Sequence, residues 1–347
     1  GFDRVIGFDM GGTSTDVTHF DGEYERSFET LVAGVRMRAP MMRIHTVAAG
    51  GGSILGFDGA RFRGGPASAG ANPGPACYRR GGPLTVTDCN VMLGKIQPGH
   101  FPAIFGDSGD EVLDRDAVSR GFAELAAEVS AAKGQPVAAE AIAEGFLRVA
   151  VDNMANAIKK ISVQRGYDVT EYALNGFGGA AGQHACLVAD ALGMRRVLLH
   201  PLAGVLSAYG MGLADIRAMR ETQLDLPFGE PTIQAEIVDA CGTLETAARA
   251  ELAAQGVAAE RVRVSTKVHL RYEGTDTSLL VELDSASLMR RAFESAHLSR
   301  FGFVSPERAL VAEAVSVEAV GLGDATPADE TAMYGNGQPL APRDTVR

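Results

Sequence analysis

A glycine-rich turn between two short apolar strands, near the start of the chain, is the feature that most constrains the fold. Residues Val5–Phe20 read VIGFDMGGTSTDVTHF, in which the first apolar run stops at Asp9 and β-type residues resume at Thr15. Because no helix-forming run follows the glycines, the loop differs from a Walker A or Rossmann loop, where a helix begins. Paired glycines let backbone N–H groups approach a phosphate, and hydroxyl side chains add donors. The segment therefore predicts a β-hairpin with a phosphate-binding turn.

The candidate site residues of this hairpin are one carboxylate and the residues of the turn. Asp9, at the strand end, can hold Mg²⁺ directly or through water, and we predict it as a metal ligand and a catalytic residue. An ordinary glycine-rich hairpin without a ligand is the alternative interpretation. The predicted phosphate-binding residues are Gly11, Gly12, Thr13, Ser14 and Thr15.

Composition narrows the class of protein. With 347 residues, 46% hydrophobic and 22% charged, the chain is long enough for about two globular domains. A net charge of −11 argues against a nucleic-acid partner. There is no apolar run of about 18 residues, so no membrane span is expected. The four cysteines lack CxxC spacing and are typical of a reduced, cytoplasmic protein. The abrupt start on a core strand predicts a fragment or subunit of something longer.

A second glycine-rich loop follows a short strand later in the chain. Residues 175–183 read NGFGGAAGQ and precede a predicted helix over 183–192. A dinucleotide-binding fingerprint requires an acidic residue at the end of the next strand, but that strand ends in His200 and Pro201. We therefore predict a loop that passes close to adenosine, with a purely structural tight turn as the alternative. The predicted nucleotide-binding residues are Gly178, Gly179, Gly182 and Gln183.

The order of the predicted elements divides the chain into two domains and a tail. Alternating strands, glycine loops and helices over 1–230 predict an α/β domain. It includes a three-stranded meander over 5–30, helices at 117–132 and 138–165, and an ordered Gly/Pro-rich insert at 50–83. Residues 231–324 predict an α+β module, and the polar residues 325–347 a poorly ordered tail.

Asp88, in the segment TVTDCN, is a second candidate catalytic residue. Its carboxylate could bind a metal or polarise a water, or it could instead cap a helix that begins near Val91. His184 could contact a phosphate at the start of its helix or be a buried structural histidine. Cys77 neighbours Arg79 and Arg80, which could lower the pKa of its thiol, but no base is identifiable nearby in the sequence.

Several long motifs together resemble the hydantoinase/oxoprolinase family. They are FDMGGTSTDV (8–17), TVAAGGGSIL (46–55), GPASAGANPGPACYRRGGPLTVTDCN (65–90), IKKISVQRGYD (158–168), YALNGFGGAAGQHACLVADALGM (172–194) and HPLAGVLSAYGMGLAD (200–215). The resemblance extends over about residues 1–325. It implies one half of an actin-like ATPase fold, the ribonuclease H-like type shared with sugar kinases and heat-shock ATPases, followed by the α+β module.

The resemblance also implies an activity, cofactors and partners. The implied activity is ATP-dependent cleavage of a cyclic amide, above all 5-oxo-L-proline to L-glutamate, with Mg²⁺ or another divalent cation. Within the family, the alternatives are N-methylhydantoin hydrolysis and the ATP-binding subunit of an acetone- or acetophenone-type carboxylase. A non-catalytic actin-like ATP switch is an alternative of another class. The implied partners are a preceding hydantoinase-type domain, a hydantoinase B-type subunit or domain, and other copies in an oligomer.

Overall fold

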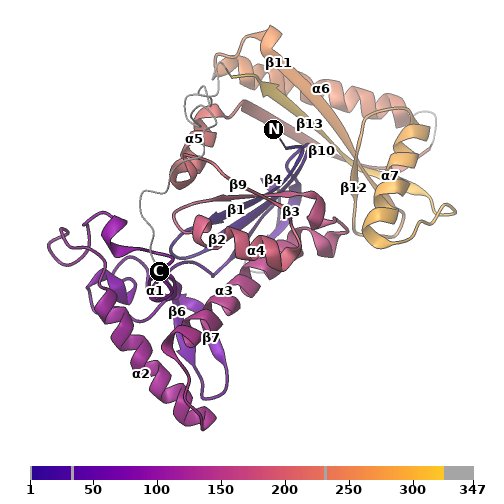
Figure 1. Ribbon diagram of the computed structural model, residues 1–347. Helices are drawn as coiled ribbons and strands as arrows, with labels where there is room; N and C mark the ends of the chain where they lie inside the picture. The colour runs from indigo at the N-terminus through magenta and orange to yellow at the C-terminus, as the bar shows by residue number, and fades with distance from the viewer. Residues whose placement is uncertain (1, 33–34, 230–232, 324–347) are drawn as a thin grey trace. The chain divides into compact units, whose positions relative to one another are not determined.

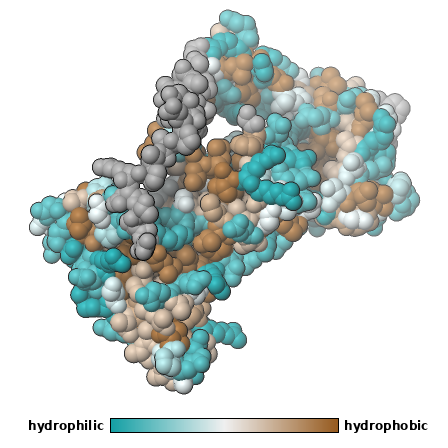
Figure 2. Space-filling view, in the orientation of Figure 1, coloured by the Kyte–Doolittle hydropathy of each residue, from teal (hydrophilic) through white to brown (hydrophobic). Residues whose placement is uncertain are grey.

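The computed structural model describes residues 2–32, 35–229 and 233–323, and the predicted tail lies outside them. The chain forms two compact units that divide between Tyr209 and Gly210 (Figure 1). Each unit combines a sheet with helices, as the mixed α/β prediction requires. In both units, hydrophilic and hydrophobic residues lie side by side on the surface (Figure 2). None of the helices within the described ranges is long and apolar enough to cross a membrane.

A five-stranded mixed sheet forms the centre of the first unit, in the order β5-β2-β1-β8-β9. The pairs β1–β2 and β2–β5 are antiparallel, whereas β1–β8 and β8–β9 are parallel. Consequently β1 and β8 end at the same edge, the edge at which both predicted loops begin. The strands are β1 (Arg4–Met10), β2 (Thr15–Asp21), β5 (Ile44–Val47), β8 (Ala173–Phe177) and β9 (Arg196–Leu199).

Helices α3 (Ala139–Ile161) and α4 (Ala185–Leu192) pack on the sheet in one hydrophobic cluster. The cluster joins alternate residues of β1 to one side of α3, as the 3.6-residue periodicity of that helix predicts. Helix α3 ends four residues earlier than predicted, because a 3₁₀ turn over Val163–Arg165 follows it and Gly166 has a left-handed backbone with φ 89°. The buried residues include Ile6, Phe8, Met10, Met154 and Ile158.

The Gly/Pro-rich insert contains more regular structure than its composition indicates. Strands β6 (Ser53–Phe57) and β7 (Phe62–Ser68) form a hairpin, and helix α1 (Val86–Met92) follows a 3₁₀ turn at Ala76–Tyr78. Beyond it, helix α2 (Arg115–Lys133) is capped at its N-terminus by Asp114, whose side chain accepts a hydrogen bond from Ala117 N, and is followed by the left-handed Gly134. The insert therefore packs with α1, α2 and α3 around a second hydrophobic core. That core includes Cys77, Cys89, Val118, Phe122 and Phe146.

The three-stranded meander predicted over residues 5–30 is wrong in its third member. Strand β3 (Arg26–Val32) pairs with β4 (Val35–Met42) in a separate two-stranded sheet, and β5 occupies the edge beside β2. An isolated bridge pairs Phe20 of β2 with Tyr24, which lies before β3 begins. Residue alternation indicates that a strand is present but does not identify its partner, which explains the error.

The second unit is an antiparallel sheet in the order β10-β13-β11-β12, with helices α6 (Ile233–Ala254) and α7 (Ala286–Phe301) packed on it. The predicted boundary at residue 230 differs from the observed division, because β10 pairs along its length with β13 and so belongs to this unit. Helix α5 (Leu206–Leu213) spans the division. The strands are β10 (Ile216–Phe228), β11 (Val262–Tyr272), β12 (Leu279–Glu282) and β13 (Leu310–Gly321).

Candidate functional site

The predicted glycine-rich hairpin is present, and its turn is short and open. Strands β1 and β2 pair in continuous register up to Met10 and Thr15, so only four residues make the turn. The turn closes with a backbone hydrogen bond of 3.1 Å from Gly11 N to Ser14 O. Gly12 and Thr13 are exposed and Ser14 is partly buried. Their backbone N–H groups and hydroxyls are therefore placed where a phosphate could reach them.

A second stretch of glycines supports one side of this turn. Gly51 N donates to Gly11 O at 3.0 Å, and Gly52 N donates to Gly12 O at 2.6 Å. A Cβ on Gly50 would lie 2.6 Å from Gly12 O, so only glycine permits this approach of two backbones. This stretch lies in the family motif at residues 46–55, but its own sequence predicts no role for it.

Asp9 lies at the end of β1 beside two groups that the sequence did not connect with it. Its Oδ2 accepts a hydrogen bond of 3.1 Å from the Ser207 hydroxyl. Across the hairpin it stands directly opposite Asp16, which accepts a hydrogen bond of 2.5 Å from Thr46 Oγ1. Like charges in directly opposite positions repel, and a cation between them removes the repulsion. Mg²⁺ is commonly held by one or two carboxylates with water and phosphate oxygens, so this pair fits such an ion.

The second predicted loop packs directly against the first. Gly178 has φ +84°, and a Cβ there would lie 2.4 Å from Asp9 Oδ1 and 2.5 Å from Met10 O. Ala180 N also donates to Met10 O at 2.9 Å. The structure thus brings together the two loops that lie some 165 residues apart in the sequence, because β1 and β8 are parallel neighbours and end at one edge.

The glycines of the two predicted loops fall into two kinds. Gly178 is required by its own backbone conformation and by the closeness of Asp9. The other four have no left-handed φ, and a Cβ on any of them would meet no atom within 4 Å. Protein packing therefore leaves space above these four backbones, as a ligand that lies against them requires. They are Gly11, Gly12, Gly179 and Gly182.

Thr15 differs from the other predicted turn residues. It is fully buried, and its hydroxyl donates to Ala49 O at 2.5 Å. This hydroxyl holds β2 to the segment after β5 and is not free to donate to a phosphate. The prediction treated the three hydroxyl residues of the turn alike, but strand pairing begins at Thr15 and turns its side chain inward.

Asp88 caps a helix, which was its alternative role, but from inside it: Thr85 is the N-cap and Asp88 is the third residue of α1, which begins at Val86, earlier than expected. It is fully buried, and its Oδ2 accepts from Thr85 N at 2.8 Å and from Thr85 Oγ1 at 2.9 Å. It also accepts from Ala76 N at 3.1 Å and Cys77 N at 2.9 Å. These bonds use both oxygens to tie the insert to α1, so the geometry offers no support for a catalytic role.

Other candidate groups of the sequence analysis are also buried. Burial raises the pKa of the Cys77 thiol, and nearby Asp88 raises it further, so a reactive thiolate is not formed. His184 is fully buried, and burial, together with the charge of Lys95, lowers its pKa to about 4. The imidazole is therefore neutral at pH 7. It contacts Asn90, which the sequence analysis did not single out.

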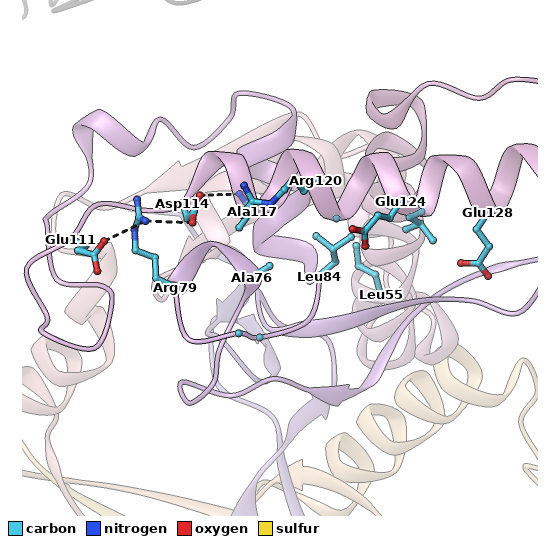
Figure 3. A pocket seen from close by; sticks show the side chains of 14 residues that line it. Leu55, Ala76, Arg79, Leu84, Glu111, Asp114, Ala117, Arg120, Glu124 and Glu128 are labelled. Atoms are coloured by element: carbon cyan, nitrogen blue, oxygen red, sulfur yellow. Dashed lines mark hydrogen bonds and ion pairs between the residues drawn. The ribbon is translucent and has the colours of Figure 1, made fainter.

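A separate pocket of about 850 Å³ lies between the insert and helix α2, beside the turn that contains Arg79 (Figure 3). Arg79 there forms ion pairs with Glu111 at 3.3 Å and with Asp114 at 3.4 Å. None of the predicted site residues lines this pocket. The pocket is therefore distinct from the two glycine loops.

Comparisons with known proteins show which family and which solved structures this chain resembles. A family model described as "Hydantoinase/oxoprolinase" matches residues 1–220. The 5-oxoprolinase PfmaA of Pestalotiopsis fici is 43% identical over 317 residues, and the 5-oxoprolinase of Saccharomyces cerevisiae is 41% identical over 320 residues. Each match covers 91% of this chain and 25% of the relative, so the chain spans about a quarter of the length of these curated relatives.

A solved structure is also similar. The crystal structure of an ATP-dependent caprolactamase from Pseudomonas jessenii superposes with a TM-score of 0.81 and 31% sequence identity. The superposition covers 94% of this chain and 48% of the caprolactamase chain. Both units described here therefore have counterparts in a single solved chain.

Proposed function

Because this chain belongs to the hydantoinase/oxoprolinase family, we propose that it supplies part of the ATP site of an enzyme that cleaves a cyclic amide. The substrate proposed is 5-oxo-L-proline and the product L-glutamate. The names of the two curated relatives support this substrate, and the caprolactamase is a further lactam-cleaving relative by its title. The proposal treats the chain as a fragment or subunit of a longer assembly.

The observation that carries the proposal is the meeting of two glycine-rich loops at one edge of the sheet. In the proposal, backbone N–H groups of the turn at Gly11–Ser14 hold the phosphates, and the loop at Gly178–Gly182 lies against adenosine. Asp9 and Asp16 hold a divalent cation, for which Mg²⁺ is the candidate. The open space above the four glycines and the opposed carboxylates support these assignments.

We further propose that the first unit is one half of an actin-like ATPase fold. The support is its mixed sheet, in which a strand hairpin and a further antiparallel strand are followed by two parallel strands reached through helices. An actin-like site has a second half, which corresponds to the preceding hydantoinase-type domain. A hydantoinase B-type subunit or domain and an oligomeric assembly complete the proposed enzyme.

An unstrained lactam is a poor electrophile, and its hydrolysis to an amino acid is uphill without coupling. ATP would supply the coupling by transferring its terminal phosphoryl group to the amide oxygen with release of ADP. Water would then add to the activated carbonyl carbon, the C–N bond would break to leave an acyl phosphate, and a second water would hydrolyse this to carboxylate and phosphate. The residues of this chain contribute positioning and charge stabilisation. The turn fixes the phosphates, and Asp9 orients the cation beside them, with Ser207 holding the carboxylate in place.

Substrate-dependent ADP release tests the proposal. This chain, combined with the other proposed domains, is supplied with ATP and one of three substrates: 5-oxoproline, N-methylhydantoin, or a ketone with bicarbonate. We expect 5-oxoproline to stimulate ADP release with glutamate formed in equal amount. Stimulation by the ketone and bicarbonate alone would replace the amidohydrolase with a carboxylase. ATP turnover that no substrate stimulates would favour a non-catalytic switch.

A further inference from the structure

Helix α1 contacts the second glycine-rich loop directly and the hairpin turn through Gly51. At its first turn, Thr87 N and Thr87 Oγ1 donate to Gly51 O at 2.8 and 2.9 Å, and Gly51 in turn donates to Gly11 O. Three residues later and on the same side of the helix, Asn90 contacts the end of the second loop. Helix α1 therefore links the turn at Gly11–Ser14 (the phosphate turn) to the loop at Gly178–Gly182 (the adenosine loop).

The contacts of Asn90 are made by one amide group. Its Nδ2 donates to Gln183 Oε1 at 2.9 Å and lies 3.2 Å from His184 Nε2. Asn90 is 1% exposed and His184 is fully buried. The Oδ1 of Asn90 has no hydrogen-bond partner, nor has His184 Nδ1. All the side-chain hydrogen bonds of this buried amide therefore go to the loop, and they offset part of the cost of its burial.

The protonation state of His184 agrees with this arrangement. For Asn90 Nδ2 to donate to Nε2, that nitrogen must carry a lone pair, which requires a neutral ring with its proton on Nδ1. Burial keeps the ring neutral at pH 7, as its pKa of about 4 indicates. Lys95 Nζ donates to Gln183 O at 2.5 Å and holds the same segment from another side.

These contacts form a closed series of hydrogen bonds that connects the two loops. The series leads from the hairpin turn to Gly51, from Gly51 through α1 to Gln183, and along the second loop to Ala180, whose N–H donates to Met10 O at 2.9 Å. We propose that Asn90 is a positioning residue, which fixes the adenosine loop relative to the phosphate turn through helix α1. This inference rests on the function proposed above. A ligand that touches both loops needs a fixed separation between them, whereas a ligand that touches only the turn does not.

Two variants and one control in the full-length protein that carries this chain test the inference. Asn90→Ala removes the amide, and Asn90→Asp keeps its shape but cannot donate to Gln183 or to neutral His184. Gln97→Ala is the matched control, because its amide Nε2 donates to Gly94 O at 2.6 Å, close to α1 in sequence. The readouts are amide hydrogen exchange over residues 178–188 without ligand, and the dissociation constants of ATP and of inorganic tripolyphosphate.

We expect both Asn90 variants to speed exchange in this segment about tenfold and to weaken ATP binding about tenfold, equivalent to 1.4 kcal/mol. Tripolyphosphate affinity should change less than twofold, and Gln97→Ala should leave all three readouts unchanged. If Asn90→Ala does not fold, Asn90→Asp alone decides. Unchanged exchange, or an equal loss of ATP and tripolyphosphate affinity, would overturn the role of Asn90 alone. Failure of the unsubstituted protein to bind ATP would overturn the proposed function itself, and with it this inference.

Discussion

Adjacent glycines in the second loop allow the fold and the ligand to be tested separately. Gly178 has a left-handed backbone, and a Cβ would lie within 2.5 Å of Asp9 Oδ1 and Met10 O. Strain of this kind costs about 1–3 kcal/mol before any repacking. At about 2–4 °C per kcal/mol for a unit of this size, Gly178→Ala should lower the melting temperature by roughly 2–12 °C.

Gly179 has neither constraint, since its φ is not left-handed and a Cβ would meet no atom within 4 Å. Gly179→Ala should therefore change the free energy of unfolding by no more than about 0.5 kcal/mol. If adenosine lies against this backbone, an added Cβ, and more so the side chain of Gly179→Val, should weaken ATP binding. The cost of overfilling a packed contact, about 1–3 kcal/mol, corresponds to roughly 5- to 150-fold in affinity.

Thermal denaturation and ATP titration on the same preparations decide between the two effects. The expected pattern is a destabilised Gly178→Ala and a stable Gly179→Val that binds ATP weakly while the KM for 5-oxoproline is unchanged. A Gly179→Val protein that keeps both its stability and its ATP affinity would refute the placement of adenosine against this loop. It would also weaken the assignment of this loop to an actin-like ATP site.

Three further predictions concern the cation, completeness and pH. Asp9→Asn in the complete enzyme should lower turnover about 10²–10³-fold with the fold intact; near-normal turnover would remove Asp9 from the site. The isolated chain should bind ATP weakly and hydrolyse it negligibly, and robust 5-oxoproline-dependent ADP release by it would contradict a shared site. Burial lowers the pKa of His184 to about 4 in the folded chain, below the value of about 6.5 of an unperturbed histidine, so stability is lost as pH falls from about 6.5 to 4. Urea denaturation should give an unfolding free energy about 2 kcal/mol lower at pH 5 than at pH 7 from this group. His184→Gln should remove this part of the pH dependence, and a variant with the same pH dependence as the unsubstituted protein would contradict the prediction.

The local features of the candidate site could be predicted from the sequence. Apolar alternation and the glycine pair predict the hairpin of β1 and β2, and the strand–loop–helix order predicts the loop after β8. The exact role of Thr15 could not be read in the same way, because it depends on where strand pairing begins. For Asp88 the sequence permits both capping and catalysis, and the structure shows the contacts of a cap.

The residues that hold the loops in place could not be predicted from the sequence. Gly51, Asn90 and Ser207 act through contacts with residues some 40 to 200 positions away. Such contacts depend on how helices and loops pack, which local patterns do not encode. The same limit explains the error in the predicted boundary at residue 230. Strand β10 belongs to the second unit because it pairs with β13, near the far end of the described chain, and the units therefore divide after Tyr209.

The place of β13 in its sheet has a consequence for biosynthesis. This strand is the last regular element of the described chain, yet it lies between β10 and β11 and pairs with both. While the ribosome is still translating the codons before Leu310, these two strands have no common partner, and their unpaired edges are exposed to other nascent chains. Closure of the sheet then joins residues about 100 positions apart, a slow kind of contact to form. We therefore expect this sheet to close only after β13 has left the ribosomal exit tunnel, and a chain truncated before Leu310 to lack the strand that joins β10 to β11.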